Sequence, residues 1–343
     1  MNKQWRLAKR PESGPSEDCF ELVEADIPEL EPGKALIKTW YLGVAPVMLR
    51  YMQNETDFES ALALGDLMLG RGIGEIIASD CPALPVGALV QARIGWQEYA
   101  LIDDQQIPAP FILEHRDLPA SYGLSSLGPS GFTALVGLQE IGQLKASDTI
   151  LVSGAAGGVG SQVAQVAKAL GADRVVGIAG GSKKCHALTE TMGYDAAIDY
   201  QSDDVCAAID EQFPDGIDLF FDNVGGVLLD NVLARIRRRA RIIICGSISE
   251  YLLAPDERHR FANLQNLGRK DARMEAFFIF DYLENHRNYS DCLASFIREG
   301  HLSPTEHLSE GIETLPRALC DLYEGNNIGV RIVRVAAEAD ADA

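Results

Sequence analysis

Four glycines occupy the point where residues 148–170 (DTILVSGAAGGVGSQVAQVAKAL) change from an apolar run to a helical pattern. The run at 150–152 is typical of a buried strand, and valines recur after the glycines at helical spacing. Glycine lets the chain turn tightly and lets a ligand approach the backbone. The free N–H groups and positive dipole end of the following helix attract an anion. The pattern predicts a site for a dinucleotide pyrophosphate, and a tight turn without a ligand is the alternative.

A second group of polar residues follows the next apolar run, at 174–179. The chain reads Gly180-Gly181-Ser182-Lys183-Lys184 there. Folds that bind NAD usually place a carboxylate at this point to bond the ribose 2′-hydroxyl, whereas a basic residue accommodates the 2′-phosphate of NADP. The absence of a carboxylate and the presence of two lysines predict NADPH as the cofactor, through charge-assisted hydrogen bonds. In the alternative, the lysines are solvated residues in a first helical turn, which is a slightly unfavourable position for cations.

These residues must be positioned by a sheet, and the middle of the chain has the pattern for one. Apolar runs alternate with helical segments, which predicts an α/β, doubly wound parallel (Rossmann) sheet. Continuous apolar runs are expected where both faces of a sheet are covered. Besides 150–152, the expected strands are 174–179, 196–199, 217–222, 241–245 and 276–280.

The flanking parts of the chain have a different pattern. The first 125 residues are rich in glycine and proline and contain short β-type runs, which predicts an antiparallel β domain or barrel. The runs lie at 35–40, 74–78, 87–94 and 96–102. A helix near 316–324 and an alternating strand at 329–335 end the chain. We therefore expect a β-rich domain, 1–126 and 303–343, interrupted by a nucleotide-binding domain, 127–302. The acidic end, 336–343, is expected to be disordered.

Composition excludes several classes of partner. The 343 residues carry a formal net charge of -20, which argues against nucleic acid and anionic membranes as partners. The sequence contains no run of about 18 apolar residues, so no membrane-spanning helix is expected. The N-terminal residues lack the apolar stretch of a signal peptide. The seven cysteines form no CxxC, which predicts reduced thiols and a cytoplasmic location. The sequence has no closely spaced Cys/His set, so no metal is expected; a site assembled from distant residues is the alternative.

Several motifs in register resemble one zinc-independent branch of the medium-chain dehydrogenase/reductases. They are GWQEY at 95–99, LGPSGFTALVGLQEIGQ at 127–143, GAAGGVGS at 154–161, AGGSKKC at 179–185, FDNVGG at 221–226, CGSISEY at 245–251 and GNNIGVRIVRV at 325–335. The branch holds prostaglandin reductases, leukotriene hydroxydehydrogenases, curcumin reductase and plant 2-alkenal reductases. The resemblance implies a Rossmann domain inserted in a GroES-like barrel domain. It also implies NADPH-dependent, zinc-independent reduction of the carbon–carbon double bond of α,β-unsaturated ketones and aldehydes, by a homodimer.

The resemblance also implies roles for individual residues. Gly157, Gly158, Val159 and Gly160 would hold the pyrophosphate. Lys184 and Tyr200 would bind the 2′-phosphate region, with Ser182 nearby. Asn223, Cys245 and Gly246 would line the ribose and nicotinamide, and Asn327 would reach the nicotinamide from the returning segment. Tyr251 would face the enone or enal substrate as a hydroxyl donor and is the expected catalytic residue.

Each assignment has a simpler alternative. Tyr200 is then a half-buried aromatic at a strand end, Asn223 a turn former and Tyr251 an exposed loop residue. Cys245 is favoured as a packing residue over a nucleophile, because nothing nearby in the sequence would lower its pKa. An arginine run invites a phosphate-binding interpretation, but cations at a helix C-terminus are the favoured account; the run is Arg235, Arg237, Arg238, Arg239 and Arg241.

The substrate side departs from the branch. Val47 and Leu49 replace a tyrosine and an arginine that are usual in the branch, Leu252 replaces an asparagine and Val330 a lysine. The resemblance therefore gives no specific substrate. Two other functions stay open beside the enone reductase: a quinone reductase of the same superfamily, and an NADPH-binding protein without turnover.

Overall fold

The chain divides into two compact units in the computed structural model, which describes residues 1–53 and 61–336. The first unit combines 1–124 with the chain from 306 onward, and the second is 125–305. The sequence placed the boundaries at 126/127 and 302/303. All of the expected disordered end except Ala336 lies outside the described residues.

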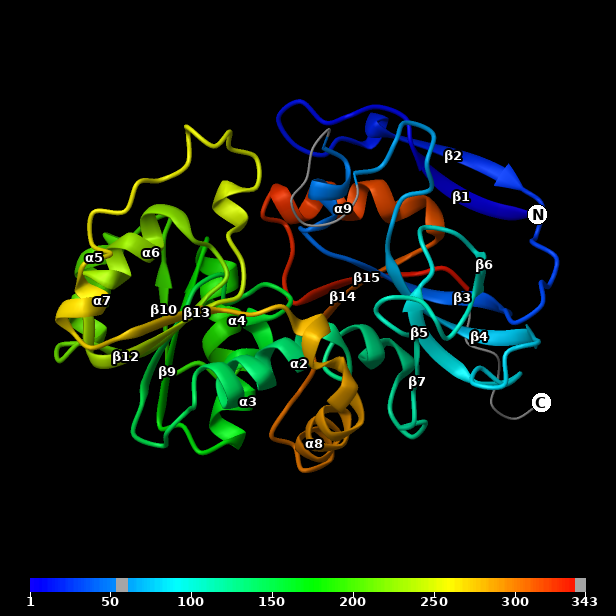
Figure 1. Ribbon diagram of the computed structural model, residues 1–343. Coiled ribbons are helices and arrows are strands. Elements are labelled where there is room, and N and C mark those ends of the chain that lie inside the picture. Colours follow the sequence, from blue (N-terminus) through cyan, green and yellow to red (C-terminus); the bar gives the residue numbers. More distant parts are fainter. Residues whose placement is uncertain (54–60, 337–343) are drawn as a thin grey trace. The chain divides into compact units, whose positions relative to one another are not determined.

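The second unit is built on a six-stranded sheet in which every neighbouring pair is parallel (Figure 1). The strand order is β10-β9-β8-β11-β12-β13. The bounds are β8 Thr149–Val152, β9 Arg174–Ala179, β10 Ala196–Asp199, β11 Ile217–Asp222, β12 Ile236–Ile244 and β13 Arg273–Ala276. The chain moves outward from β8 to β10 and then returns to the other side of β8. The expected doubly wound α/β sheet is confirmed.

Helices cover both faces of this sheet. Val176 and Ile178 of β9 pack with Ile209 and with Leu229 and Val232, which come from two helices on one face. Gly177, whose position points to the other face, lies against Leu188 of a third helix. The bounds are α2 Pro129–Val136, η3 Gly137–Ile141, α3 Gly160–Ala169, α4 Ser182–Thr191, α5 Val205–Gln212, α6 Gly226–Leu233, η4 Ile248–Glu250, α7 Asn266–Arg269, η5 Ile279–Asn285 and α8 His286–Arg298.

Two sequence expectations in this unit are wrong. The sixth strand, expected at 276–280, ends at Ala276, and Phe278 lies beyond it with 38% of its surface exposed. The arginine run does not cap a helix: only Arg235 follows α6 and donates to Asn231 O, at 2.9 Å. The other four arginines lie in β12. A strand with three consecutive arginines near its start was mistaken for a helix end, because short segments are ambiguous by periodicity alone.

The first unit contains a seven-stranded sheet and a separate two-stranded sheet, β1 with β2. The order is β14-β15-β3-β4-β5-β7, with β6 also paired to β3, and only β14 with β15 is parallel. Strands from the two chain ends therefore share one sheet. The bounds are β1 Asn2–Leu7, η1 Glu17–Cys19, β2 Phe20–Ala25, β3 Ala35–Val44, α1 Met48–Tyr51, β4 Arg71–Ser79, β5 Leu89–Arg93, β6 Tyr99–Ile102, β7 Phe111–Ile112, η2 Ala120–Leu124, β14 Glu306–Glu310, η6 Ile312–Thr314, α9 Leu315–Tyr323 and β15 Val330–Arg334.

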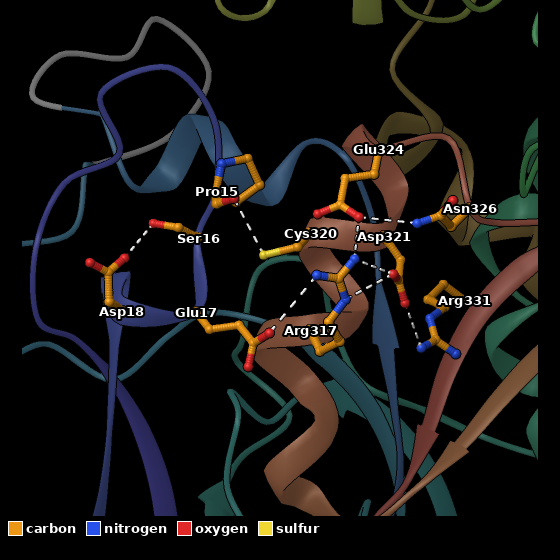
Figure 2. Close-up of polar contacts among 10 residues, drawn as sticks. All are labelled: Pro15, Ser16, Glu17, Asp18, Arg317, Cys320, Asp321, Glu324, Asn326 and Arg331. Atoms are coloured by element: carbon orange, nitrogen blue, oxygen red, sulfur yellow. Dashed lines mark hydrogen bonds and ion pairs between the residues drawn. The ribbon is translucent and has the colours of Figure 1, made fainter.

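A polar network holds α9 in this unit (Figure 2). Arg331 of β15 is only 4% exposed and pairs with Asp321 of α9, with 3.3 Å between its Nη2 and Oδ2. Arg317 also pairs with Asp321, at 2.8 Å, and with the more exposed Glu324. The thiol of Cys320 donates to Pro15 O at 3.3 Å, which ties the helix to the N-terminal segment.

Candidate cofactor and substrate site

Most of the expected site residues meet at one edge of the parallel sheet. Residues 157–160 follow β8, Ser182 and Lys184 follow β9, and Tyr200 follows β10. Asn223 follows β11, and Cys245, Gly246 and Tyr251 follow β12. This is the carboxyl edge of the strands, and the order reverses between β8 and β11. Ligands of open α/β sheets bind outside the carboxyl ends at such a reversal.

The glycine turn after β8 is closely packed. A Cβ on Gly160 would lie 2.3 Å from Gly154 O, so only glycine fits at the start of α3. Gly154 itself has a φ of +57°, and its carbonyl accepts from Gly157 N–H at 3.0 Å. The buried Tyr194 donates to Gly160 O at 2.6 Å and fixes this end of the helix. The turn brings the N-terminus of α3 to the carboxyl edge of the sheet, where a pyrophosphate would bind.

The turn after β9 places Lys184 in a partly buried position. Lys184 is half-buried in the first turn of α4, and burial lowers the pKa of its ammonium group. Within 1–53 and 61–336 its side chain has no acidic partner. The ring of Tyr200 lies over Gly180, where a Cβ would come within 2.7 Å of the ring. Tyr200 is 57% exposed, so the ring packs on backbone and still presents surface to solvent. Ser182 is exposed.

The turn after β11 is held by a buried carboxylate that sequence reasoning missed. Asp222 has no exposed surface and accepts Val224 N–H at 3.0 Å and Gly225 N–H at 3.1 Å. Burial raises its pKa, against the hydrogen bonds that it accepts. The hydroxyl of Ser153 donates to Asp222 at 2.6 Å, and Asn223 donates through Nδ2 to Ser153 O at 2.7 Å. These bonds tie the ends of β8 and β11 together. The sequence signal that could have indicated this turn is Asp222 three residues before Gly225.

The turn after β12 brings Tyr251 back to the sheet edge. A Cβ on Gly246 would lie 3.3 Å from both Tyr251 Oη and Asn223 O, so the phenol and the Asn223 turn meet over Gly246. Cys245 donates its backbone N–H to Asp222 O at 2.8 Å. Burial raises the pKa of its thiol to about 12, so this cysteine is protonated at neutral pH, as a packing residue would be.

The loop beyond Tyr251 is fastened to α6 by a second buried acid that sequence reasoning missed. Asp230 is 5% exposed and accepts from His259 Nε2 at 3.0 Å, Ala262 N–H at 3.1 Å and Asn263 N–H at 2.8 Å. Burial would raise the pKa of Asp230, but these bonds outweigh burial and lower it. No sequence signal links residues 29 positions apart. The departure Leu252 lies near the start of this loop, 43% exposed.

Asn327 belongs to the first unit, and only one of its two side-chain polar atoms makes a hydrogen bond among the described residues. It is 6% exposed and donates through Nδ2 to Gly329 O at 2.6 Å. Its Oδ1 is buried and, among the described residues, has no hydrogen-bond partner. A buried acceptor without a donor is costly, and the N–H group of a carboxamide such as that of nicotinamide would satisfy it. The departure Leu49, in contrast, is fully buried in the hydrophobic core of the first unit.

In the described part of the chain, no three His, Cys, Asp or Glu side chains are grouped so as to hold a metal ion. The same residues include no helix long and apolar enough to cross a membrane.

Comparisons with known proteins agree with this arrangement. Residues 3–109 match a family described as the N-terminal domain of oxidoreductase, and residues 158–297 match one described as zinc-binding dehydrogenase. The NADPH-dependent curcumin reductase of Escherichia coli is 33% identical over 341 residues, 98% of each chain. The NADP(+)-dependent 2-alkenal reductase of Nicotiana tabacum is 36% identical over 343 residues, also 98% of each chain. The crystal structure of CurA from Vibrio vulnificus in complex with NADPH has a TM-score of 0.90 and 35% identity, over 98% of this chain and 100% of that one.

Proposed function

Because the chain belongs to the zinc-independent branch of the medium-chain dehydrogenase/reductases that includes the curcumin and 2-alkenal reductases, we propose that it reduces the carbon–carbon double bond of enones and enals. The cofactor is NADPH, and the enzyme is an oxidoreductase of the C=C type. The observation that carries the proposal is the meeting of the glycine turn, the Asn223 turn and the Tyr251 phenol at the carboxyl edge of the sheet.

The residues present fit the cofactor. The closely packed turn at Gly160 offers the N-terminus of α3 to the pyrophosphate. The half-buried Lys184 offers a cation to the 2′-phosphate. The orphaned Oδ1 of Asn327 offers an acceptor to the carboxamide. We assign these roles, together with those of Gly157, Gly158, Val159, Ser182, Tyr200, Asn223, Cys245 and Gly246, as proposals. The second unit is then the NADPH-binding domain and the first the substrate domain.

Bound NADPH supplies a hydride, which in this reaction goes to the β-carbon of the conjugated substrate. Negative charge then develops on the carbonyl oxygen as an enolate, and a proton from a hydroxyl or water adds to the α-carbon to give the saturated product. We assign Tyr251 as the hydrogen-bond donor to that oxygen, since a phenol over Gly246 stands beside the residues proposed to line the nicotinamide. A donor aimed at developing charge lowers the barrier more than it strengthens substrate binding.

The test of this function is product analysis with labelled cofactor. Purified protein is incubated with NADPH deuterated at the transferred position and with a panel of simple enones, enals and quinones. Deuterium at the β-carbon of a saturated ketone is the expected result. Label on the carbinol carbon would show carbonyl reduction and refute the proposal. Turnover of quinones alone would favour the quinone reductase, and NADPH binding without any turnover would favour a binding protein.

We also propose that the protein is a homodimer joined through its second unit. Strand β13 ends the six-stranded sheet and presents unpaired backbone groups among the described residues, with the exposed Phe278 just beyond it. A sheet edge of this kind needs cover. Light scattering at micromolar concentration should give twice the chain mass of 37.2 kDa; the mass of one chain would refute the dimer.

We place the enzyme in the cytoplasm, because all seven cysteines are free thiols in the structure. Fractionation of cells that express the chain at its natural level tests this location.

A further inference from the structure

A carboxylate lies at the turn after β9, although residues 180–184 of that turn contain none. It is Asp199, the last residue of the neighbouring strand β10, whose Cα pairs in register with Ala179 at the end of β9. Asp199 Oδ1 accepts from Gly181 N–H at 2.7 Å and from Gln201 N–H at 3.0 Å. Gly181 is the residue that precedes α4, so the carboxylate reaches the same turn that leads to Lys184.

This carboxylate is ionised at neutral pH. The backbone N–H groups of Gly181 and Gln201 hold the pKa of Asp199 below its usual range. A second acid is beside it, because Asp203 Oδ2 accepts from Asp199 N–H at 2.9 Å. The turn therefore carries negative charge on its β10 side and the cation of Lys184 on its α4 side.

The two charges favour different cofactors. In folds of this class a carboxylate at the end of the second strand bonds the ribose 2′-hydroxyl of NAD, whereas a cation accommodates the 2′-phosphate of NADP. We propose that Asp199 is a specificity-determining residue that reduces the preference for NADPH over NADH. Its carboxylate repels the 2′-phosphate that Lys184 attracts. The inference rests on the proposed function, because it concerns the same cofactor site.

The hydrogen bonds of Asp199 allow a clean substitution. Both backbone donors use Oδ1, so the amide oxygen of Asp199→Asn can keep both bonds while the charge is removed. Asp195 supplies a matched control at the opposite end of β10. It precedes the strand, and its carboxylate accepts from Val175 N–H at 2.7 Å and from Lys168 at 2.7 Å. Asp195→Asn therefore changes the net charge equally, but far from the proposed cofactor turn.

The experiment measures dissociation constants of NADPH, NADH and 2′,5′-ADP by calorimetry at low salt, for the full chain and both variants. Asp199→Asn should tighten NADPH and 2′,5′-ADP about three- to tenfold and leave NADH unchanged or weaker, because one repulsive charge near a phosphate is removed. The gain should shrink at high salt, where exposed charges are screened. Asp195→Asn should leave the ratio of NADPH to NADH affinity unchanged.

Three results would overturn the inference: unchanged affinities in Asp199→Asn, an equal change for NADPH and NADH, or an equal gain in Asp195→Asn. Asp199→Ser provides the same test if the amide variant is unstable. Failure of the wild-type chain to bind any of the three ligands would instead refute the proposed function, so the two failures are distinguishable.

Discussion

At the scale of single residues, Lys184 is the side chain on which recognition of the 2′-phosphate should depend most. Lys184→Ala should raise the dissociation constant of NADPH roughly tenfold or more and leave that of NADH little changed, because one charge-assisted bond is lost. Lys183→Ala is the control, since Lys183 is exposed and should matter much less. Equal weakening of NADPH and NADH would remove Lys184 from the 2′-phosphate site.

Tyr251 should act on the rate rather than on cofactor binding. Tyr251→Phe should lower kcat for a simple enone by about ten- to a thousandfold, because the donor to the developing enolate oxygen is lost. The dissociation constant of NADPH should stay the same. Stopped-flow measurement of a single turnover separates this step from product release. An unchanged rate would leave the double-bond reductase standing but exclude Tyr251 from its mechanism.

Residue types and spacing predicted which candidate site residues follow strand ends, and a parallel sheet brings those ends to one edge. They could not reveal Asp222, Asp230 or Asp199 as organising acids. Each of these carboxylates accepts from backbone N–H groups of a turn or loop, and such bonds depend on where loops pass in space. The sequence analysis assumed that no carboxylate lies at the turn after β9. The structure shows that Asp199, from the neighbouring strand β10, supplies one.

At the scale of elements, the attachment of α9 depends on one buried ion pair more than on its exposed neighbours. Asp321→Ala should lower the free energy of unfolding by about 3 kcal/mol or more, because Arg331 would be left as an uncompensated buried charge. Glu324→Ala, at the residue that follows the last turn of α9, is the control. It should cost far less, because its partner Arg317 is partly solvated. Chemical denaturation of both variants measures the difference, and equal losses would contradict this account.

The strands show where element prediction succeeds. Strands β9, β10 and β11 have the predicted bounds, because each is a short apolar run between turn residues. Strand β12 begins five residues earlier than predicted, at Ile236 instead of Arg241. Three consecutive arginines, 237–239, lie near its start; Arg237 pairs with Asp218, and further along Arg241 pairs with Asp148. Charged residues at a strand start are stabilised by partners elsewhere in the sequence, so local periodicity could not identify this segment.

At the scale of the whole molecule, we predict that the enzyme works without metal. Purified, active protein should contain no stoichiometric zinc by elemental analysis, because the sequence has no ligand cluster. Addition of a chelator should leave the rate of NADPH oxidation unchanged. Loss of activity on chelation, restored by zinc, would contradict the assignment to a zinc-independent branch.

The shared sheet of the first unit also has a consequence for how the protein is made. Strand β15 lies between β14 and β3, and the core beside Leu42 contains Leu315, Leu319 and Val333 from the end of the chain. The opening 124 residues therefore leave the ribosome without the strands and helix that cover them, whereas residues 125–305 emerge as one uninterrupted segment. Domains generally fold as units during synthesis, so residues 125–305 should fold first. Residues 1–124 would then lack the strands and helix that complete their sheet and core until β15 has been translated.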